Sequence, residues 1–395
     1  MSVSHARDTA VTSTDEADGG RAPGLMEVLA LVPDPRGRRG RRYQLTFVLA
    51  VAAACALAGA RNFREAGDHA ADLPQEVLAR LGGRRHPLAG KIIAPSETRI
   101  RTLVHAIGAD LLDDLIGGWL RGLAGGGRLD EEALTAIAID GKWLCGVLDG
   151  RVKLFAAMLH QDKTVIAQVR VPDDTTETTQ VRELLDAVDL RNAVVTADAA
   201  HACRETAQYI AGDAEDGGRE ADYFLFVKGN TPHLQRAAFD AIQRDFPRDP
   251  DYTELDRSHG RTVRRSLWTA EAAGLDFPVA ARVARIRRDG YDRDGQLISK
   301  EIVHAVTSLT ADQASAAGLA AIARGQWGIE SVHWVRDTAW AEDASTGYAG
   351  NGPQVMATLR NLAMSLLYIA GVKEITRTLQ SIARDRNRLL DYLPL

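Results

Sequence analysis

The sequence has few cysteines and lacks several patterns that would assign a chemistry by themselves. Its three cysteines, Cys55, Cys145 and Cys203, occur without CxxC spacing, which argues against a disulfide framework or a zinc knuckle and favours a reducing cytoplasm. No GxxxxGK[ST] or GxGxxG pattern lies between a predicted strand and helix, so nucleotide-driven chemistry is unsupported. GxSxG and HExxH are absent too, which leaves serine-hydrolase and zinc-protease chemistry without a motif.

A targeting signal and a long hydrophobic run are also missing. The first 20 residues mix Ser, Thr, Asp and Gly and lack the basic-then-apolar layout of a signal peptide. The apolar run from Leu45 to Ala60 has 16 residues, fewer than the ~20 that a membrane-spanning helix needs, and it is rich in alanine. We therefore predict a buried core helix in this run, no membrane partner and a cytoplasmic protein.

The length and composition are those of a globular protein with more than one structural part. A chain of 395 residues suggests two or three such parts, and 45% hydrophobic with 26% charged residues is ordinary. The net charge of −5 hides a local basic cluster formed by Arg36, Arg38, Arg39, Arg41 and Arg42. Such local patches, rather than net charge, determine whether a protein can bind DNA.

The first third of the chain is predicted to be a tail followed by helices. Residues 1–22 have few large apolar side chains and are predicted to be disordered. Residues 23–130 show helical spacing, with a stop at Pro33-Asp-Pro-Arg36 and a start at Pro95-Ser-Glu-Thr98. The helices before Leu123 are compatible with a helix-turn-helix that binds DNA, although short helices that pack into a bundle give this spacing more often.

The middle of the chain predicts an α/β domain. Two of its apolar runs end in an aspartate, Ala136–Asp140 and Ala193–Asp198. The predicted order is three strands, helix, strand, helix, strand, which matches a ribonuclease-H-like core whose first Asp lies on strand one and whose second ends strand four. We predict this core over residues 131–228, a β-rich insertion over 229–309, a core helix over 310–345 and C-terminal helices over 346–395.

The predicted core helix after the insertion carries a polar face. Gln326, Glu330, His333 and Asp337 follow the spacing i, i+4, i+7 and i+11, so they share one side of a helix. Glu330 is a candidate third carboxylate beside Asp140 and Asp198. His333 and Asp337 either support that site or face solvent.

Three carboxylates from separate elements suit a divalent metal. Mg²⁺ prefers carboxylate oxygens, and two such ions can drive phosphodiester cleavage. We therefore predict that Asp140, Asp198 and Glu330 are catalytic and bind Mg²⁺, with Mn²⁺ as a substitute. Taken singly, an Asp at the end of a strand is more often a turn former or a helix cap.

Basic and polar residues spread along the chain are candidate contacts to double-stranded DNA. Cations that bind phosphate give affinity without reading sequence, although a solvated surface is the alternative for each single arginine. The candidates are Arg36, Arg38, Arg39, Arg41, Arg42, Lys142, Lys228, Asn230, His259, Arg261, Arg264, Arg265, Arg324 and His333.

Together these features resemble the H-repeat-associated DDE transposases of bacterial insertion sequences. The resemblance is carried by Pro33-Asp-Pro-Arg36, Leu57-Ala-Gly-Ala60, Ile139-Asp-Gly-Lys142, Thr196-Ala-Asp198, Val227-Lys-Gly-Asn230, His259-Gly-Arg261, Trp327-Gly-Ile-Glu330, His333-Trp334 and Glu342-Asp-Ala-Ser345. It implies that Asp140, Asp198 and Glu330 form a DDE triad acting on the ends of the protein's own element. It also implies DNA-end binding by the helical N-terminal part, a homodimer on DNA and association with the nucleoid.

Departures from the family pattern lie near the motifs. Trp143 and Cys145 replace the usual Thr and Arg, Gln326 replaces His, and Ser331 replaces Asn. Asp174 stands where the family has Lys. Since a lost cation weakens phosphate binding, an alternative is a catalytically weakened or host-adopted transposase-derived DNA-binding protein. A third hypothesis is a nuclease that cuts without joining.

Overall fold

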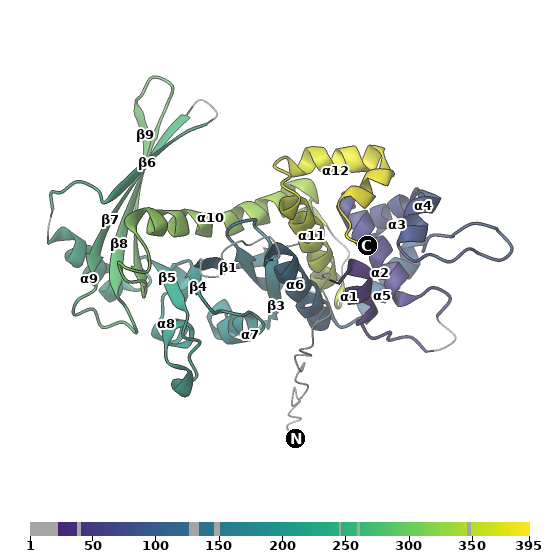
Figure 1. Cartoon of the computed structure of the whole chain (residues 1–395), viewed down its shortest axis with the longest axis horizontal. Helices are drawn as coiled ribbons and strands as arrows, with labels where there is room; N and C mark the ends of the chain where they lie inside the picture. The colour runs from purple at the N-terminus through teal and green to yellow at the C-terminus, as the bar shows by residue number, and fades with distance from the viewer. Residues whose placement is uncertain are drawn as a thin grey trace.

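The computed structural model describes residues 23–37, 41–125, 134–145, 151–244, 246–258, 261–345 and 349–395. Within them the chain is a mixed α/β protein (Figure 1), with helices of both chain ends gathered at one end and a β-ribbon at the other. The predicted tail over 1–22 and the candidates Arg38, Arg39 and His259 lie outside the described residues.

The first five strands follow the predicted order. β1 (Thr135–Leu144), β2 (Val152–Leu159) and β3 (Val165–Val171) form an antiparallel meander. The helix α7 (Val181–Asp186) leads to β4 (Ala193–Ala197), and α8 (Arg204–Ala211) leads to β5 (Asp222–Val227). β4 pairs parallel with both β1 and β5, and all its residues are buried, which explains its unbroken apolar sequence.

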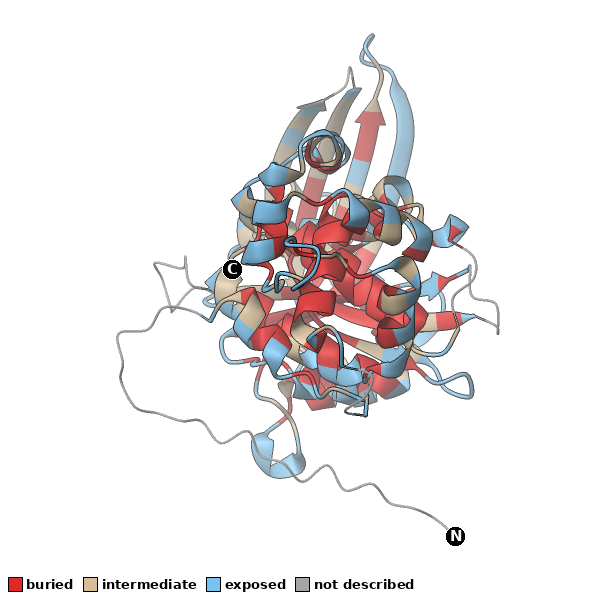
Figure 2. Ribbon diagram, turned by 90° about the vertical axis from the view of Figure 1, so that its right-hand side faces the viewer, coloured by how far each residue is buried: buried red, intermediate tan, exposed pale blue. Residues whose placement is uncertain are grey.

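The predicted insertion continues this sheet instead of forming a separate β unit. Its strands are β6 (Tyr252–Ser258), β7 (Arg261–Glu271), β8 (Arg282–Tyr291) and β9 (Leu297–Thr307). β9 pairs antiparallel with β5, so one nine-stranded sheet has the order β3-β2-β1-β4-β5-β9-β8-β7-β6. Buried residues run through the middle of the sheet and thin out toward the far end of the ribbon (Figure 2).

The insertion also contains a helix that the β-rich prediction missed. The helix α9 (Pro232–Gln243) precedes the four strands and packs on the ribbon. Its signal was present in the sequence, because Pro232 occupies the first turn and Leu234, Ala238 and Ile242 recur every four residues.

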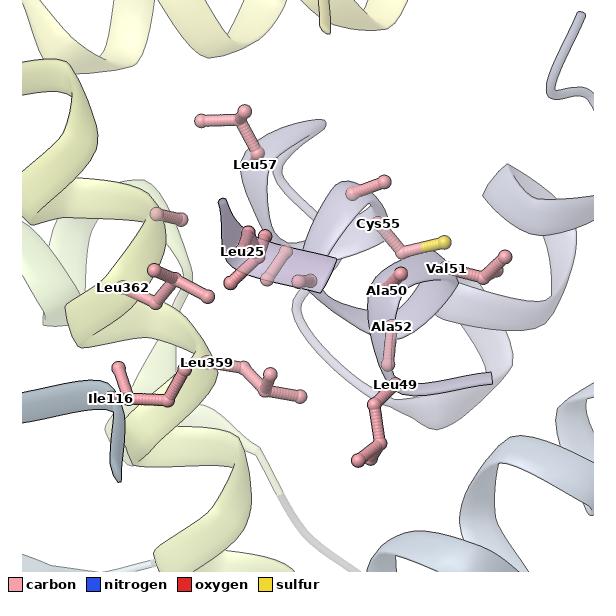
Figure 3. Close-up of a cluster of buried hydrophobic side chains, with 14 of the residues drawn as sticks. Leu25, Leu49, Ala50, Val51, Ala52, Cys55, Leu57, Ile116, Leu359 and Leu362 are labelled. Atoms are coloured by element: carbon pink, nitrogen blue, oxygen red, sulfur yellow. The ribbon is translucent and has the colours of Figure 1, made fainter. Parts of the chain in front are cut away.

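The N-terminal and C-terminal helices form one packed body. The helices of this body are α1 (Leu25–Ala30), α2 (Leu45–Leu57), α3 (Phe63–Ala71), α4 (Gln75–Arg80), α5 (Glu97–Ala106), α6 (Ala109–Gly125), α11 (Gly352–Ile369) and α12 (Ile375–Arg384). The predicted buried helix is confirmed as α2, whose side chains pack between α1 and α11 (Figure 3). Across the described residues, no helix combines the length and apolarity that crossing a membrane would require.

A buried row of polar side chains joins this helical body to the long helix α10 (Ala316–Ala339). Asp113 of α6 accepts hydrogen bonds from Gln354 at 2.8 Å and from Gln168 at 3.1 Å. Asn361 of α11 donates to Gln168 and accepts from Arg336 of α10 at 3.2 Å. Buried polar groups are costly unless they are paired, so these bonds fix how the helical body sits against α10.

Candidate functional site

The polar face predicted for residues 326–337 lies on α10 and is turned toward β1. Gln326 is buried, donates from Nε2 to the carbonyl of Ile139 at 3.3 Å and is bonded to the hydroxyl of Thr196. Eleven positions further on, Asp337 accepts from the Lys142 ammonium at 2.7 Å. These contacts at both ends of the face hold α10 along the strand, with Glu330 between them.

Asp140 of β1 and Asp198, the residue directly after β4, occupy neighbouring positions on adjacent stretches of chain. β1 and β4 are parallel, and Ile139 pairs with Ala197, so the next residue on each chain is one of the two aspartates. Asp198 also caps the short helix η3 (Ala199–His201) by accepting from the Ala200 backbone N–H at 3.0 Å. Its carboxylate is nevertheless exposed, so the capping role leaves oxygen lone pairs available.

The electrostatics of Asp140 reflect a concentration of negative charge. Burial, together with the charges of Asp198, Glu177 and Glu330, raises the pKa of Asp140 to about 7, although the Gly141 backbone N–H opposes the shift. Like charges close to a carboxylate favour its protonated form. The charges that act on Asp140 therefore include both predicted partners, Asp198 after β4 and Glu330 on α10, and one further residue, Glu177.

Glu177 is the member of this group that the sequence analysis missed. It forms an ion pair with Lys153, and its Oε2 lies 3.4 Å from Nε2 of His201. The His201 ring is fully buried and stacks on Phe155 with centroids 5.0 Å apart. The sequence signal for Glu177 is the stretch Asp174-Thr-Thr-Glu177. This stretch departs from the family pattern at Asp174 and retains the glutamate at its last position.

Gly141 is the position that accommodates Glu177, and this gives a testable prediction. A Cβ at residue 141 would lie 1.8 Å from the Glu177 carboxylate oxygen, so Gly141→Ala must displace that side chain from Lys153 and His201. We expect a loss of about 1–3 kcal/mol in the free energy of unfolding, measured by urea denaturation. Gly118→Ala on α6 is the matched control, since a Cβ at that position would point into open space, with no neighbouring element within 4 Å. Equal stability of the two variants would contradict this packing.

His333 lies beside Asp140 as a neutral group. Its Nδ1 is 3.6 Å from Oδ2 of Asp140. Burial, with the nearby charges of Arg336 and Lys142, lowers the pKa of His333 to about 3, so the imidazole is uncharged at neutral pH. His333 thus faces the carboxylates, as the supporting role requires, and contributes a polar neighbour without an ion pair.

The carboxylates have the ligand atoms that a hard divalent cation prefers, but their side chains are not gathered around one point. Within the described residues, no three His, Cys, Asp or Glu side chains stand close enough together to enclose a metal ion. The donors nonetheless have the oxygen chemistry that Mg²⁺ prefers. Burial and, to a smaller extent, the neighbouring carboxylates raise the pKa of Asp140, and a bound cation would favour its charged form.

Several predicted DNA contacts are engaged inside the protein. Lys142 is buried, with its ammonium 2.7 Å from Asp337 and 3.4 Å from Asp343, so the predicted phosphate contact would have to compete with an internal ion pair. Asn230 donates from Nδ2 to the Ala199 carbonyl at 2.6 Å and so braces the turn that follows Asp198. Both residues position the site from within.

Several of the predicted arginines are paired with acids. Arg265 and Arg324 both reach Glu254, at 3.1 and 3.3 Å. Arg264 lies 3.3 Å from Asp289, a carboxylate that is only 1% exposed. Arg36 near the N-terminus is bound in the same way to Asp34 at 2.9 Å. Arg41, Arg42, Lys228 and Arg261 are exposed.

A groove of about 1270 Å³ runs along α10 and reaches Glu330. Its walls come from the start of β1, the β2–β3 turn, α10 and the ribbon. Its basic lining residues are Arg121, Lys163, Arg191, Lys228, Arg265, Arg288 and Arg324. The carboxylate of Glu330 therefore borders a channel with more cations than anions along its wall.

Three of the five departures from the family pattern have partners within the protein. Gln326 is buried in the bonds described above, and the Ser331 hydroxyl accepts from Lys163 at 2.8 Å. The Lys153 ammonium lies 5.1 Å from the centroid of the Trp143 ring, in a cation–π contact. These substitutions change how the elements are held together and leave all three predicted carboxylates in place.

Comparison with known proteins gives two family matches. A family model described as "Transposase DDE domain" matches residues 139–366, which is more than half of the chain and includes all three carboxylates. A second family model, described as "DDE_Tnp_1-associated", matches residues 26–120, the greater part of the N-terminal helices.

Full-length relatives show moderate identity. The chain is 26% identical over 368 residues to "Putative transposase YncI" of Escherichia coli O157:H7, covering 87% of each chain. It is 24% identical over 394 residues to "H repeat-associated putative transposase YhhI" of Escherichia coli K12, covering 93% of this chain and 97% of the relative. A solved piggyBac transposase synaptic complex with hairpin DNA aligns over 93% of this chain and 79% of that one, at 9% identity and a TM-score of 0.38.

Proposed function

The chain belongs to the transposase DDE-domain family, as its motifs predicted, and from this premise we propose that it cleaves and rejoins DNA at the ends of an insertion sequence. The observation that carries the proposal is the adjacency of Asp140 and Asp198 on two parallel strands, with Glu330 on the helix packed along the first of them. In this proposal strands β1–β5 form a ribonuclease-H-like core.

Each of the three carboxylates has a proposed role. Asp140 and Asp198 would hold divalent metal from the sheet, and Glu330 would complete the site from α10. Bound Mg²⁺, or Mn²⁺ in its place, supplies activation of a water or 3′-hydroxyl nucleophile and stabilises the leaving oxygen. The chain's own contribution is to fix these oxygens: Gln326 ties α10 to β1, Asn230 braces the turn after Asp198, and neutral His333 adds no competing charge beside Asp140.

The proposed substrate is double-stranded DNA, at the element ends and at the target. The groove along α10 supports this proposal, because cations on its wall would attract the phosphate backbone toward Glu330. Two element ends must be joined to one target, so we propose that two copies of the chain act together on DNA.

A metal-binding prediction tests the carboxylate site without requiring DNA cleavage. We expect Mg²⁺ to raise the melting temperature of the wild-type protein at pH 8, because a cation that binds only the folded state stabilises it. Asp140→Asn should melt at a higher temperature than wild type in EDTA, since the uncompensated charge is gone, and should respond much less to Mg²⁺. Asp173→Asn, an exposed aspartate after β3, is the control and should respond like wild type. An unchanged Mg²⁺ response in Asp140→Asn would remove Asp140 from the metal site.

The activity itself is tested on the element's own ends. Purified protein is incubated with Mg²⁺, a duplex carrying the terminal repeats that flank the coding region, and a supercoiled target plasmid. We expect cleavage at the repeat boundary and covalent joining of the 3′-end to the plasmid. Cleavage without joining would instead indicate a nuclease, and binding without cleavage would indicate the catalytically weakened protein.

Three of the five departures from the family pattern, which do not include the lost cations at Cys145 and Asp174, are accommodated by the protein framework. Gln326, Ser331 and Trp143 each have a partner in the protein framework, and none of them removes a carboxylate. This placement supports the active transposase over the binding-only alternative.

A further inference from the structure

A second cleft, about 450 Å³ in volume, lies in the N-terminal helical body, apart from the carboxylates. It is formed where the segment before α2 meets the loop between α4 and α5, and both loops project at the end of the molecule opposite the ribbon (Figure 1). Its charged and titratable lining residues are Arg41, Arg42, Arg84, Arg85 and His86. Among the described residues that line this cleft, none is acidic.

The α4–α5 loop is held in a defined shape. Gln75 of α4 clamps its far end, since its amide accepts from the Ile92 N–H at 2.8 Å and donates to the Ile92 carbonyl at 3.0 Å. Arg85 and Ile92 form an antiparallel bridge, and the Arg85 guanidinium donates to the Gly90 carbonyl at 2.9 Å. A shaped loop loses less conformational entropy on binding than an unrestrained one.

Close packing at the base of the loop adds to this rigidity. A Cβ on Gly83 would lie 2.5 Å from the Ile92 side chain and 2.9 Å from the Phe47 ring, so only glycine lets the loop approach α2 this closely. The two arginines that follow Gly83 are thereby held at the mouth of the cleft.

The arginines of this cleft differ from those of the ribbon in their electrostatic partners. Arg84 and Arg85 are exposed, and in the described part of the chain neither has a carboxylate within ion-pair distance. Arg42 lies 6.0 Å from the Tyr43 ring centroid. Arg41 does approach an acid, Asp34 at 3.5 Å, and that carboxylate is already bound by Arg36.

Unpaired arginines bind phosphate more favourably than paired ones, because no internal ion pair has to be broken. The ribbon arginines 264, 265, 287 and 288 each lie within ion-pair distance of an acid. A phosphate approaching these four arginines must compete with Glu254, Asp289 or Glu301. The described lining of the N-terminal cleft contains no acidic residue to compete with a phosphate.

We propose that this cleft is a binding site for the phosphate backbone of duplex DNA, separate from the carboxylate site, and that Arg84 and Arg85 are its principal contacts. The choice of duplex DNA as the polyanion rests on the proposed function. The cleft holds DNA by charge and does not read its sequence, while the groove along α10 presents a strand to Glu330.

The experiment measures how binding to a random-sequence duplex depends on salt, in EDTA so that no strand is cut. Each phosphate contact contributes about 0.9 to the slope of log K against log salt concentration. We expect Arg84→Ala/Arg85→Ala to lower that slope by about 2 and to weaken binding about tenfold or more. Arg84→Lys/Arg85→Lys should keep most of the slope, because it keeps both charges.

The rival surface is tested in the same assay with Arg264→Ala/Arg288→Ala on the ribbon. We expect this double variant to lower the slope by less than the cleft variant does, because both ribbon arginines already lie within ion-pair distance of an acid. A normal slope for the alanine variant of the cleft, or a larger loss for the ribbon variant, would overturn the proposal. Equal binding of a single-stranded RNA through Arg84 and Arg85 would overturn the assignment to duplex DNA.

The outcomes for this cleft and for catalysis are separable. Asp198→Asn keeps both cleft arginines and should bind duplex with the wild-type slope. Cleft-dependent binding by a wild-type protein that never cleaves element ends would refute the proposed catalysis and leave the cleft assignment standing. Cleavage by the wild-type protein, with duplex binding that does not depend on Arg84 and Arg85, would refute the cleft assignment and leave the proposed catalysis standing.

Discussion

Asp198→Asn and Glu330→Gln are each expected to reduce cleavage of element-end DNA by about 10²–10³-fold or more, because each replaces a proposed metal-binding carboxylate by a neutral amide of the same shape. The measurement is the initial rate of strand cleavage in Mg²⁺, at a protein concentration that saturates the DNA. Both carboxylates are exposed, so neither substitution should disturb the fold. Wild-type cleavage by either variant would refute the triad.

The control for this result is a glutamate in the same groove that has no proposed metal role. Glu301 of β9 lines the groove with Glu330 and lies 3.8 Å from Arg288. Glu301→Gln should cleave at close to the wild-type rate. All three variants should bind duplex DNA and melt within a few degrees of wild type. A loss of binding that parallels the loss of cleavage would assign Glu330 to DNA contact instead of catalysis.

Glu342→Ala is expected to cause the largest loss of stability, about 3–5 kcal/mol in the free energy of unfolding. Glu342 lies in the short helix η5 (Glu342–Ala344), buried between Arg336 at 2.8 Å and Arg360 at 2.9 Å. Burial alone would raise the pKa of Glu342, yet the two guanidinium groups hold it at about 2. Removing the carboxylate takes away the anion that the two buried guanidinium groups share.

The measurement is urea denaturation followed by circular dichroism. Glu374→Ala provides the control, because Glu374 forms an ion pair of similar length with Arg377 at 3.1 Å in which both side chains are largely exposed. Exposed pairs contribute about 0–1 kcal/mol, so this variant should unfold close to wild type. A loss below about 1 kcal/mol in Glu342→Ala would mean that η5 is not held through this cluster.

Local sequence signals determined much of the fold and the choice of candidate carboxylates. The compact apolar runs before Asp140 and Asp198 predicted strands because a strand covered on both faces is apolar throughout, and β1 and β4 lie there. The spacing of Gln326, Glu330, His333 and Asp337 predicted one polar helix face, and α10 turns that face to β1. The same local spacing in Leu234, Ala238 and Ile242 could have predicted α9.

Local sequence patterns could not predict which charged side chains form ion pairs with one another. The family motif predicts a phosphate contact for Lys142, and the structure adds an ion pair with Asp337, from a helix almost two hundred positions away. The ribbon arginines likewise gained acids from neighbouring strands, whereas Arg84 and Arg85 gained none among the described residues.

The sequence by itself therefore determined which residue types lie on which strand or helix, because side-chain periodicity is a property of a few consecutive residues. Only the tertiary structure decided that Glu177 joins the carboxylates, that four of the ribbon's arginines meet acids and that a basic cleft with no acid in its described lining lies in the N-terminal body. The physical reason is that charge interactions depend on distance in space, and strand register and helix packing bring together residues far apart in the chain.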